Sequence, residues 1–133
     1  MIGVEISIGE AIDRMTILEI KSKRVKGPLS RKMCEEQYKA MYEKVVQSIG
    51  AALDVSPMNY LTHELTLCNQ ALWDLEDNIL SMMAKESPDQ HELSAVACAI
   101  VRWNDRRHEM KKKLDEAHGD KFFGEVKEHP SYE

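Results

Sequence analysis

The stretch LTHELTLCNQALWDLEDNILSM, residues 61–82, decides the predicted fold. Its apolar side chains recur at three- and four-residue steps, which places them on one face of an α-helix. Ser56-Pro57 before the stretch is typical of a helix start, and Ser87-Pro88-Asp89 after it predicts a break that also caps the next helix. The stripe consists of Leu61, Leu65, Cys68, Leu72, Leu75, Ile79 and Met82.

Three further segments have helical periodicity. Ser7 and Glu10 form a capping-box pattern, in which the Ser7 hydroxyl accepts from the backbone N–H of Glu10 and the Glu10 carboxylate reaches back. Ser30 is expected to cap a second helix, and Gly119 fits the end of the last one. The expected helices span about 8–25, 31–54, 57–86 and 89–117. Because the breaks between them are short, the predicted fold is all-α, a four-helix antiparallel up-down bundle.

Length and composition place the chain in a single domain. It has 133 residues, of which 31% are charged and only 6% aromatic, and this balance suits a helical protein. We expect residues 1–7 to form a short strand or extended arm and residues 8–117 to form the bundle. Residues 118–133, which include Phe122 and Phe123, are expected to dock as a tail.

Charge, hydropathy and cysteine usage narrow the functional classes. The net charge of −5 argues against generic nucleic-acid coating, and no apolar run approaches the roughly 18 residues that span a membrane. The first residues lack the basic and apolar regions of a secretory signal. Three widely spaced cysteines without a CxxC pair argue against a zinc site or a disulfide framework. Together these features predict a cytoplasmic protein.

Polar residues interrupt the apolar faces of the third and fourth helices. In an antiparallel hairpin that turns near Pro88, Trp73 faces Trp103, and Asn69 lies level with Arg107. The first helix turns near Gly27 at the same end of the bundle, so its own polar residues come to this height. The predicted polar cluster consists of Glu10, Asp13, Arg14, Asn69, Glu76, Asp77, Asn104, Arg106 and Arg107.

This cluster has three interpretations. In the first, it is a pocket for a small phosphorylated ligand such as a nucleotide or nucleotide-sugar, which the protein could sequester. The residues expected to bind this ligand are Arg14, Asn69, Trp73, Trp103, Asn104, Arg106 and Arg107. In the second, the protein is an all-α nucleotide pyrophosphohydrolase that uses Mg²⁺. The metal ligands would be Glu10, Asp13, Glu76 and Asp77. In the third, the cluster is a structural ion-pair network in an interaction module.

Residues 14–32 form a basic region with seven lysines and arginines against one glutamate. It is either a solvated helix end that complements the macrodipole or a landing patch for phosphates or a partner. The methionines and aromatic residues leave enough apolar surface for a homo-oligomer without requiring one.

Four blocks of the chain resemble the domain of unknown function 6165, a family of small bacterial and phage proteins. SIGEAIDRMTILEIK at 7–21 resembles the family's opening S-x-GELIDKITILEIK, with Arg14 in place of its lysine. NQALWDLED at 69–77 and NDRR at 104–107 resemble its next two blocks, although the basic residue that usually follows the former is absent. Glu125-Val-Lys127 and Ser131-Tyr132 resemble its closing block, interrupted here by Glu128-His129-Pro130. The resemblance implies the position of a site and not its chemistry, and the phage members make a ligand-sequestering role an expectation.

Overall fold

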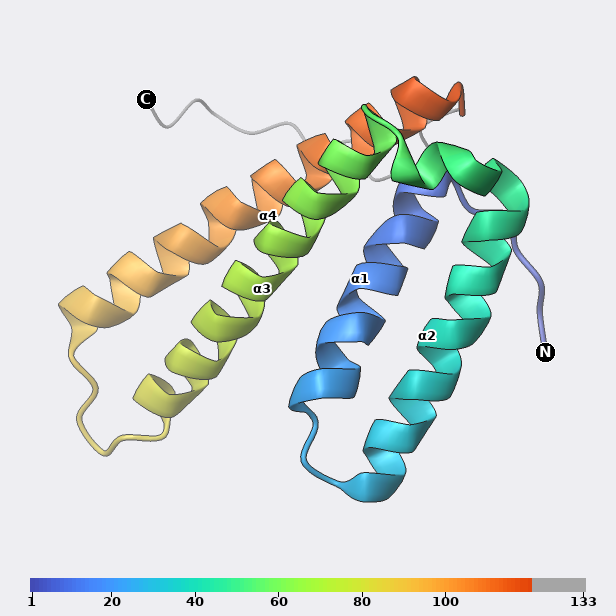
Figure 1. The fold of residues 1–133 in the computed structure, drawn as a ribbon. Coiled ribbons are helices and arrows are strands. Elements are labelled where there is room, and N and C mark those ends of the chain that lie inside the picture. The colour runs from blue at the N-terminus through green and yellow to red at the C-terminus, as the bar shows by residue number, and fades with distance from the viewer. Residues whose placement is uncertain (121–133) are drawn as a thin grey trace.

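A computed structural model describes residues 1–120, and this part of the chain is all-α (Figure 1). Its elements are α1 (Ile8–Arg24), α2 (Pro28–Ile49), the 3-10 helix η1 (Gly50–Asp54), α3 (Met58–Met83) and α4 (Gln90–His118). Residues 1–7 form an extended arm and contain no strand. Most of the expected tail lies outside the described residues. No helix within residues 1–120 combines the length and apolar character needed to cross a lipid bilayer.

Local capping sets several helix ends where the sequence predicts them. The Ser7 hydroxyl accepts a hydrogen bond from the backbone N–H of Glu10 at 3.3 Å, and α1 begins at the next residue after Ser7. Asp89 Oδ1 accepts from two N–H groups of the first turn of α4, at 2.9 and 3.1 Å. Gly119 ends α4 in the left-handed conformation with φ 81°, which glycine adopts without strain.

Other predicted boundaries are wrong. α2 begins at Pro28 and not after a Ser30 cap, because proline at the first helical position lacks only an N–H that would have no helical partner. The same helix ends at Ile49, where Gly50 takes a positive φ of 55° and η1 follows. α3 begins one residue later than predicted and ends at Met83, three residues earlier.

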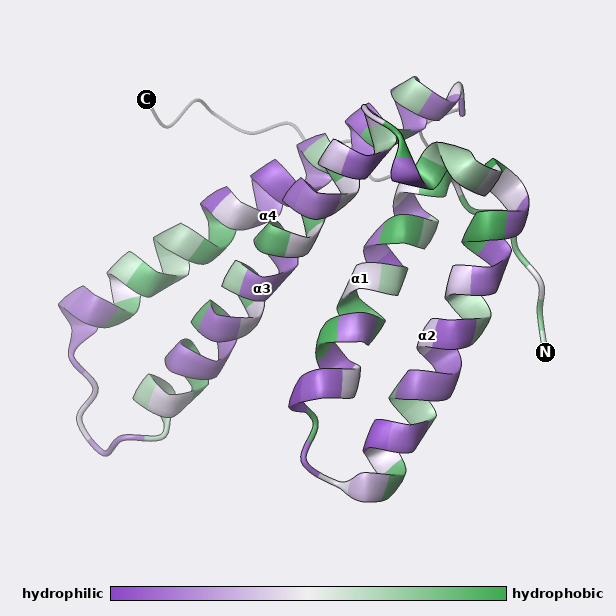
Figure 2. Ribbon diagram, viewed as in Figure 1, coloured by the Kyte–Doolittle hydropathy of each residue, from purple (hydrophilic) through white to green (hydrophobic). Residues whose placement is uncertain are grey.

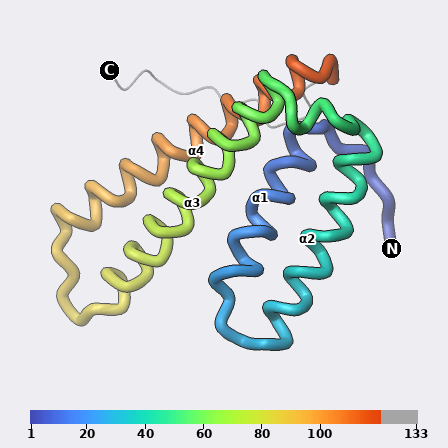
Figure 3. The backbone as a smooth tube through the Cα atoms, viewed as in Figure 1, coloured from blue at the N-terminus to red at the C-terminus, as the bar shows by residue number. Residues whose placement is uncertain are grey.

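The four helices form two antiparallel hairpins, α1–α2 and α3–α4 (Figures 1 and 3). The hairpins meet where α1 begins and α4 ends, and they diverge toward their turns. α1 packs against the other three helices, whereas α2 packs mainly against α1 and η1. The bundle is therefore closed at one end only.

The hydrophobic core lies at the closed end, where apolar segments of α1, α2 and η1 face one another (Figure 2). Its buried residues come from all four helices and from η1. They are Ile8, Ile12, Met15, Val45, Ile49, Leu53, Met58, Leu61, Leu65, Cys68, Met110 and Leu114. The core therefore fixes the start of α1 against the end of α4.

The other ends of the hairpins have no core. No residue is buried between positions 21 and 44 or between positions 73 and 109. The apolar stripe of α3 is buried only as far as Leu72, and Leu75, Ile79 and Met82 remain half-buried. Toward their turns the hairpins diverge, so α3 packs mainly against α4 there, although Arg24 of α1 still reaches Asp74 of α3.

Candidate functional site

Asp13 lies at the centre of the polar cluster. α1 holds its side chain at 0% exposure, beside the buried Ile12. The carboxylate accepts two hydrogen bonds from Arg107 of α4, from Nε to Oδ1 at 2.9 Å and from Nη2 to Oδ2 at 2.5 Å. This bidentate pair is the strong geometry for arginine and a carboxylate, and it raises the pKa of Arg107.

Asn69 brings α3 into the same network. Its Nδ2 donates to Asp13 Oδ1 at 3.0 Å and to Thr16 Oγ1 at 2.8 Å. Thr16 Oγ1 in turn donates to the backbone carbonyl of Asp13 at 2.8 Å. Asn69 and Arg107 therefore meet at one height, as counting from the turns predicts, and they meet on Asp13.

A second carboxylate, Glu10, extends the network toward solvent. Lys111 Nζ lies 2.5 Å from Glu10 Oε2 and 3.8 Å from Asp13 Oδ2, and Arg14 Nε donates to Glu10 Oε1 at 3.2 Å. Burial raises the pKa of Glu10, but Lys111 and Arg14 outweigh burial, so the pKa falls below its ordinary value. The Glu10 carboxylate binds these two cations instead of reaching back to Ser7.

The start of α1 is bound to the end of α4 by backbone contacts. The N–H of Gly9 donates to Asp115 Oδ1 at 2.6 Å, and the N–H of Ile8 donates to Asp120 Oδ2 at 2.8 Å. A Cβ on Gly9 would lie 2.3 Å from the Lys111 carbonyl oxygen, so only glycine permits this approach. Burial raises the pKa of Asp115, and the Gly9 N–H opposes that rise.

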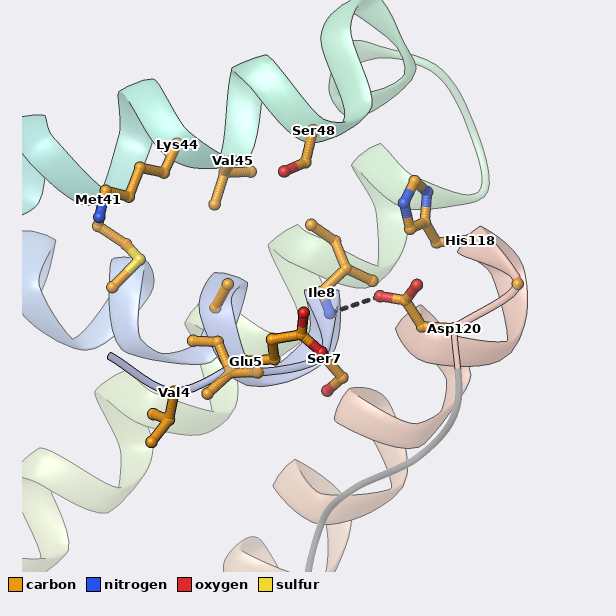
Figure 4. A pocket seen from close by; sticks show the side chains of 13 residues that line it. Val4, Glu5, Ser7, Ile8, Met41, Lys44, Val45, Ser48, His118 and Asp120 are labelled. Atoms are coloured by element: carbon orange, nitrogen blue, oxygen red, sulfur yellow. Dashed lines mark hydrogen bonds between the residues drawn. The ribbon is translucent and has the colours of Figure 1, made fainter. Parts of the chain in front are cut away.

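A cavity of about 590 Å³ opens beside this contact (Figure 4). Residues of the arm, the second half of α2 and the end of α4 line it, and Lys44 and His118 are its two basic side chains. The N-terminus of α1 favours negative charge, and the carboxylates of Asp115 and Asp120 already supply it. None of the predicted ligand-binding residues lines this cavity.

The other predicted ligand-binding residues lie at the edge of the network or outside it. Asn104 Oδ1 accepts from Arg107 Nη1 at 3.4 Å. Arg106 is exposed, donates to Glu64 at 2.8 Å, and has its guanidinium carbon 6.0 Å from the ring centroid of Trp103. Trp73 is half-buried on α3. The facing of the two indoles stays a prediction, and the stacked aromatic pair in residues 1–120 is Tyr38 with Tyr42.

The four residues predicted to bind Mg²⁺ do not form one set. Glu10 and Asp13 are paired with cations, whereas Glu76 and Asp77 are exposed on α3. Across residues 1–120, no group of three or more acidic, histidine or cysteine side chains is placed to hold a metal ion. The side chains of the described chain therefore do not fit the predicted metal site.

Both carboxylates of the network are paired with cations, two carboxylates against three cations. Glu10 and Asp13 oppose Arg14, Arg107 and Lys111, and the fork of Arg107 is filled by Asp13. A buried pair of this kind adds little net stability but can specify a single packing arrangement. The arrangement of these side chains suits the fixing of α1 against α3 and α4.

Two members of the network were not predicted. Lys111 belongs to a run of three lysines near the end of α4, yet it is buried against Glu10. Its spacing of four residues from Arg107 on α4 could have indicated that both point inward. Thr16 follows Asp13 by three residues on α1, which is the same signal.

The hairpin ends carry opposite charge. Residues 74–101, here called the acidic end, contain six acidic residues and one lysine. Residues 21–34, here called the basic end, contain six lysines and arginines and no acidic residue. Arg24 Nη1 pairs with Asp74 Oδ1 and so connects the basic end to the start of the acidic end.

Large apolar side chains are exposed at both ends. Leu80 and Met83 are 64% and 62% exposed on the acidic end, where Val101 is also exposed. Leu29 and Met33 are 73% and 52% exposed on the basic end. Both ends thus combine charge with exposed apolar side chains in the part of the chain that the structure describes.

Comparisons with known proteins add no relative. No protein-family model, no curated protein and no solved structure matches the chain. The resemblance to the domain of unknown function 6165 therefore stays a prediction.

Proposed function

We propose that the protein is an interaction module that binds a protein partner through the ends of its two hairpins. The observation that carries the proposal is the absence of any buried residue from 73 to 109, although this segment of α3 and α4 contains a long series of apolar side chains. Exposed apolar surface of this extent is typical of protein interaction sites. The Asp13 network supports the same function, because it holds the two hairpins in one arrangement.

Site-specific photo-crosslinking in cells that produce the protein tests this proposal. A photoreactive amino acid replaces Leu80 or Met83 on the acidic end, and Leu67 on the same helix serves as the matched control because its side chain is also exposed. We expect protein adducts from positions 80 and 83 and none from position 67. If neither end position forms an adduct, the proposal is refuted.

A second candidate is binding of a phosphorylated small molecule at the surface near Trp103. A hollow of about 470 Å³ there is lined by Arg102, Trp103, Asp105, Arg106 and Glu109. It is supported by an indole that could stack on a base and by the Arg106 guanidinium beside that indole. Its weakness is that Glu64 already pairs with Arg106.

Thermal unfolding with a panel of nucleotides, with and without Mg²⁺, tests this candidate. Binding would raise the unfolding temperature in proportion to the logarithm of ligand concentration, and Arg106→Met would abolish that rise. Arg24→Met, which removes an exposed arginine from another surface, is the control. A nucleotide response that Arg106→Met does not change would reject this hollow as the site.

A further inference from the structure

Within residues 1–120, one ion pair connects the acidic end to the basic end across the gap between the hairpins. Arg24, the last residue of α1, reaches Asp74 on α3. α3 continues for nine more residues to Met83, which at 1.5 Å per residue is about 14 Å of helix. α1 has ended by then, so the acidic surface past Asp74 has no basic neighbour from α1.

We infer that a second copy of this chain covers the hairpin ends, with the acidic end of each copy against the basic end of the other. This inference rests on the proposed interaction function and names its partner. Each copy carries one acidic and one basic end, so a two-fold axis satisfies both ends of both copies at once. Because the two contacts close on each other, the pairing forms a closed dimer and not an open filament of copies.

Charge and shape favour this partner over an unrelated one. Six acidic residues and one lysine on 74–101 face six basic residues without an acid on 21–34. Each end is an antiparallel pair of helices with exposed apolar side chains, and two such pairs pack as a four-helix arrangement. The contact would bury Leu80 and Met83 of one copy together with Leu29 and Met33 of the other.

Charge reversal provides a direct test, with mass measured by light scattering during size-exclusion chromatography. Wild type is expected at about twice 15.3 kDa in low salt and to dissociate as salt rises. D77K/E86K reverses charge on the acidic end and K26E/K32E on the basic end, and all four side chains are exposed. Each variant alone should dissociate at least tenfold more readily than wild type.

Mixing the two variants is the decisive step. In the mixture the reversed acidic end of one variant meets the reversed basic end of the other, while the two unaltered ends meet at the second contact. The mixture should therefore recover the dimer mass. E109K/K113E, which exchanges an exposed ion pair elsewhere on α4, is the matched control and should stay dimeric.

The outcomes separate this inference from the function on which it rests. A monomeric wild type at 100 µM in low salt, or a dimer indifferent to both reversals, overturns pairing through the ends of two copies. If position 80 then still crosslinks to a different protein, the interaction function stands with another partner. If it forms no adduct at all, both fail.

Discussion

At the scale of single residues, one buried carboxylate organises the polar network. Asp13 lies on α1 with its side chain fully buried, and it accepts hydrogen bonds from Asn69 of α3 and Arg107 of α4. Removing one member of such a pair leaves a buried charge without its partner, which costs more than the intact pair contributes.

Arg107→Met is therefore expected to destabilise the fold by about 3 kcal/mol, because Asp13 loses its bidentate partner. Urea unfolding measures the effect. Arg106→Met is the matched control, since Arg106 is the neighbouring arginine on α4 but is exposed, and its midpoint should equal that of wild type. Equal midpoints for both variants would show that the Arg107 pair does not hold the hairpins together.

Gly9→Ala is a second residue-scale test. Alanine within a helix ordinarily stabilises it, but here the new Cβ would meet the Lys111 carbonyl oxygen at 2.3 Å and Asp115 Oδ1 at 2.7 Å. We expect a loss of about 1–3 kcal/mol, since α1 must move away from α4. Gly3→Ala, where nothing lies within 4 Å, should leave the thermal midpoint unchanged. A stabilised Gly9→Ala variant would contradict the close approach of the two helices.

At the scale of elements, the ion pairs between α1 and α4 make stability depend on pH. The pKa of Glu10 is lowered in the folded state, so the contribution of this carboxylate is present above its ordinary pKa of 4.5 and is lost as pH falls through the folded value. Glu10→Gln should therefore unfold at lower urea concentration than wild type at pH 7, with the difference shrinking below pH 4.5. Glu109→Gln, at an exposed site, is the control and should show no such window. A difference that grows on acidification would contradict the assigned direction.

Local signals in the sequence predict much of the architecture. The cap at Ser7, the cap at Asp89 and the left-handed Gly119 each depend on a few adjacent residues, and all three are confirmed. The meeting of Asn69 with Arg107 follows from counting residues back from a turn, which needs only a straight antiparallel hairpin.

The divergence of the hairpins could not be predicted in the same way. Leu75, Ile79 and Met82 continue the stripe of Leu65 and Leu72 without a change of residue type. Periodicity shows which face of a helix is apolar, but not whether another helix covers that face. For the same reason the sequence places the predicted metal ligands of α3 in the interior. Glu76 and Asp77 in fact lie on the exposed part of that helix.

At the scale of the whole molecule, dimer formation should slow hydrogen exchange of the backbone amides in the acidic and basic ends. Hydrogen exchange measured by mass spectrometry should show amides of 21–34 and 74–101 exchanging at least tenfold faster in the D77K/E86K monomer than in wild type. Amides in the core segments of α1 and α3 should exchange equally in both. Uniform acceleration along the chain would indicate general destabilisation instead of an uncovered surface.

The contact between the start of α1 and the end of α4 has a consequence for biosynthesis. The carboxylates that accept from the backbone N–H groups of Ile8 and Gly9 lie 112 and 106 residues further along the chain. On the ribosome, α1 emerges long before the carboxylates that accept hydrogen bonds from its first turn. Its apolar face cannot pack against Met110 and Leu114 until these residues have also emerged. The native closed end can therefore form only once α4 has been translated, so a nascent chain released earlier would lack the groups that lock its first helix in place.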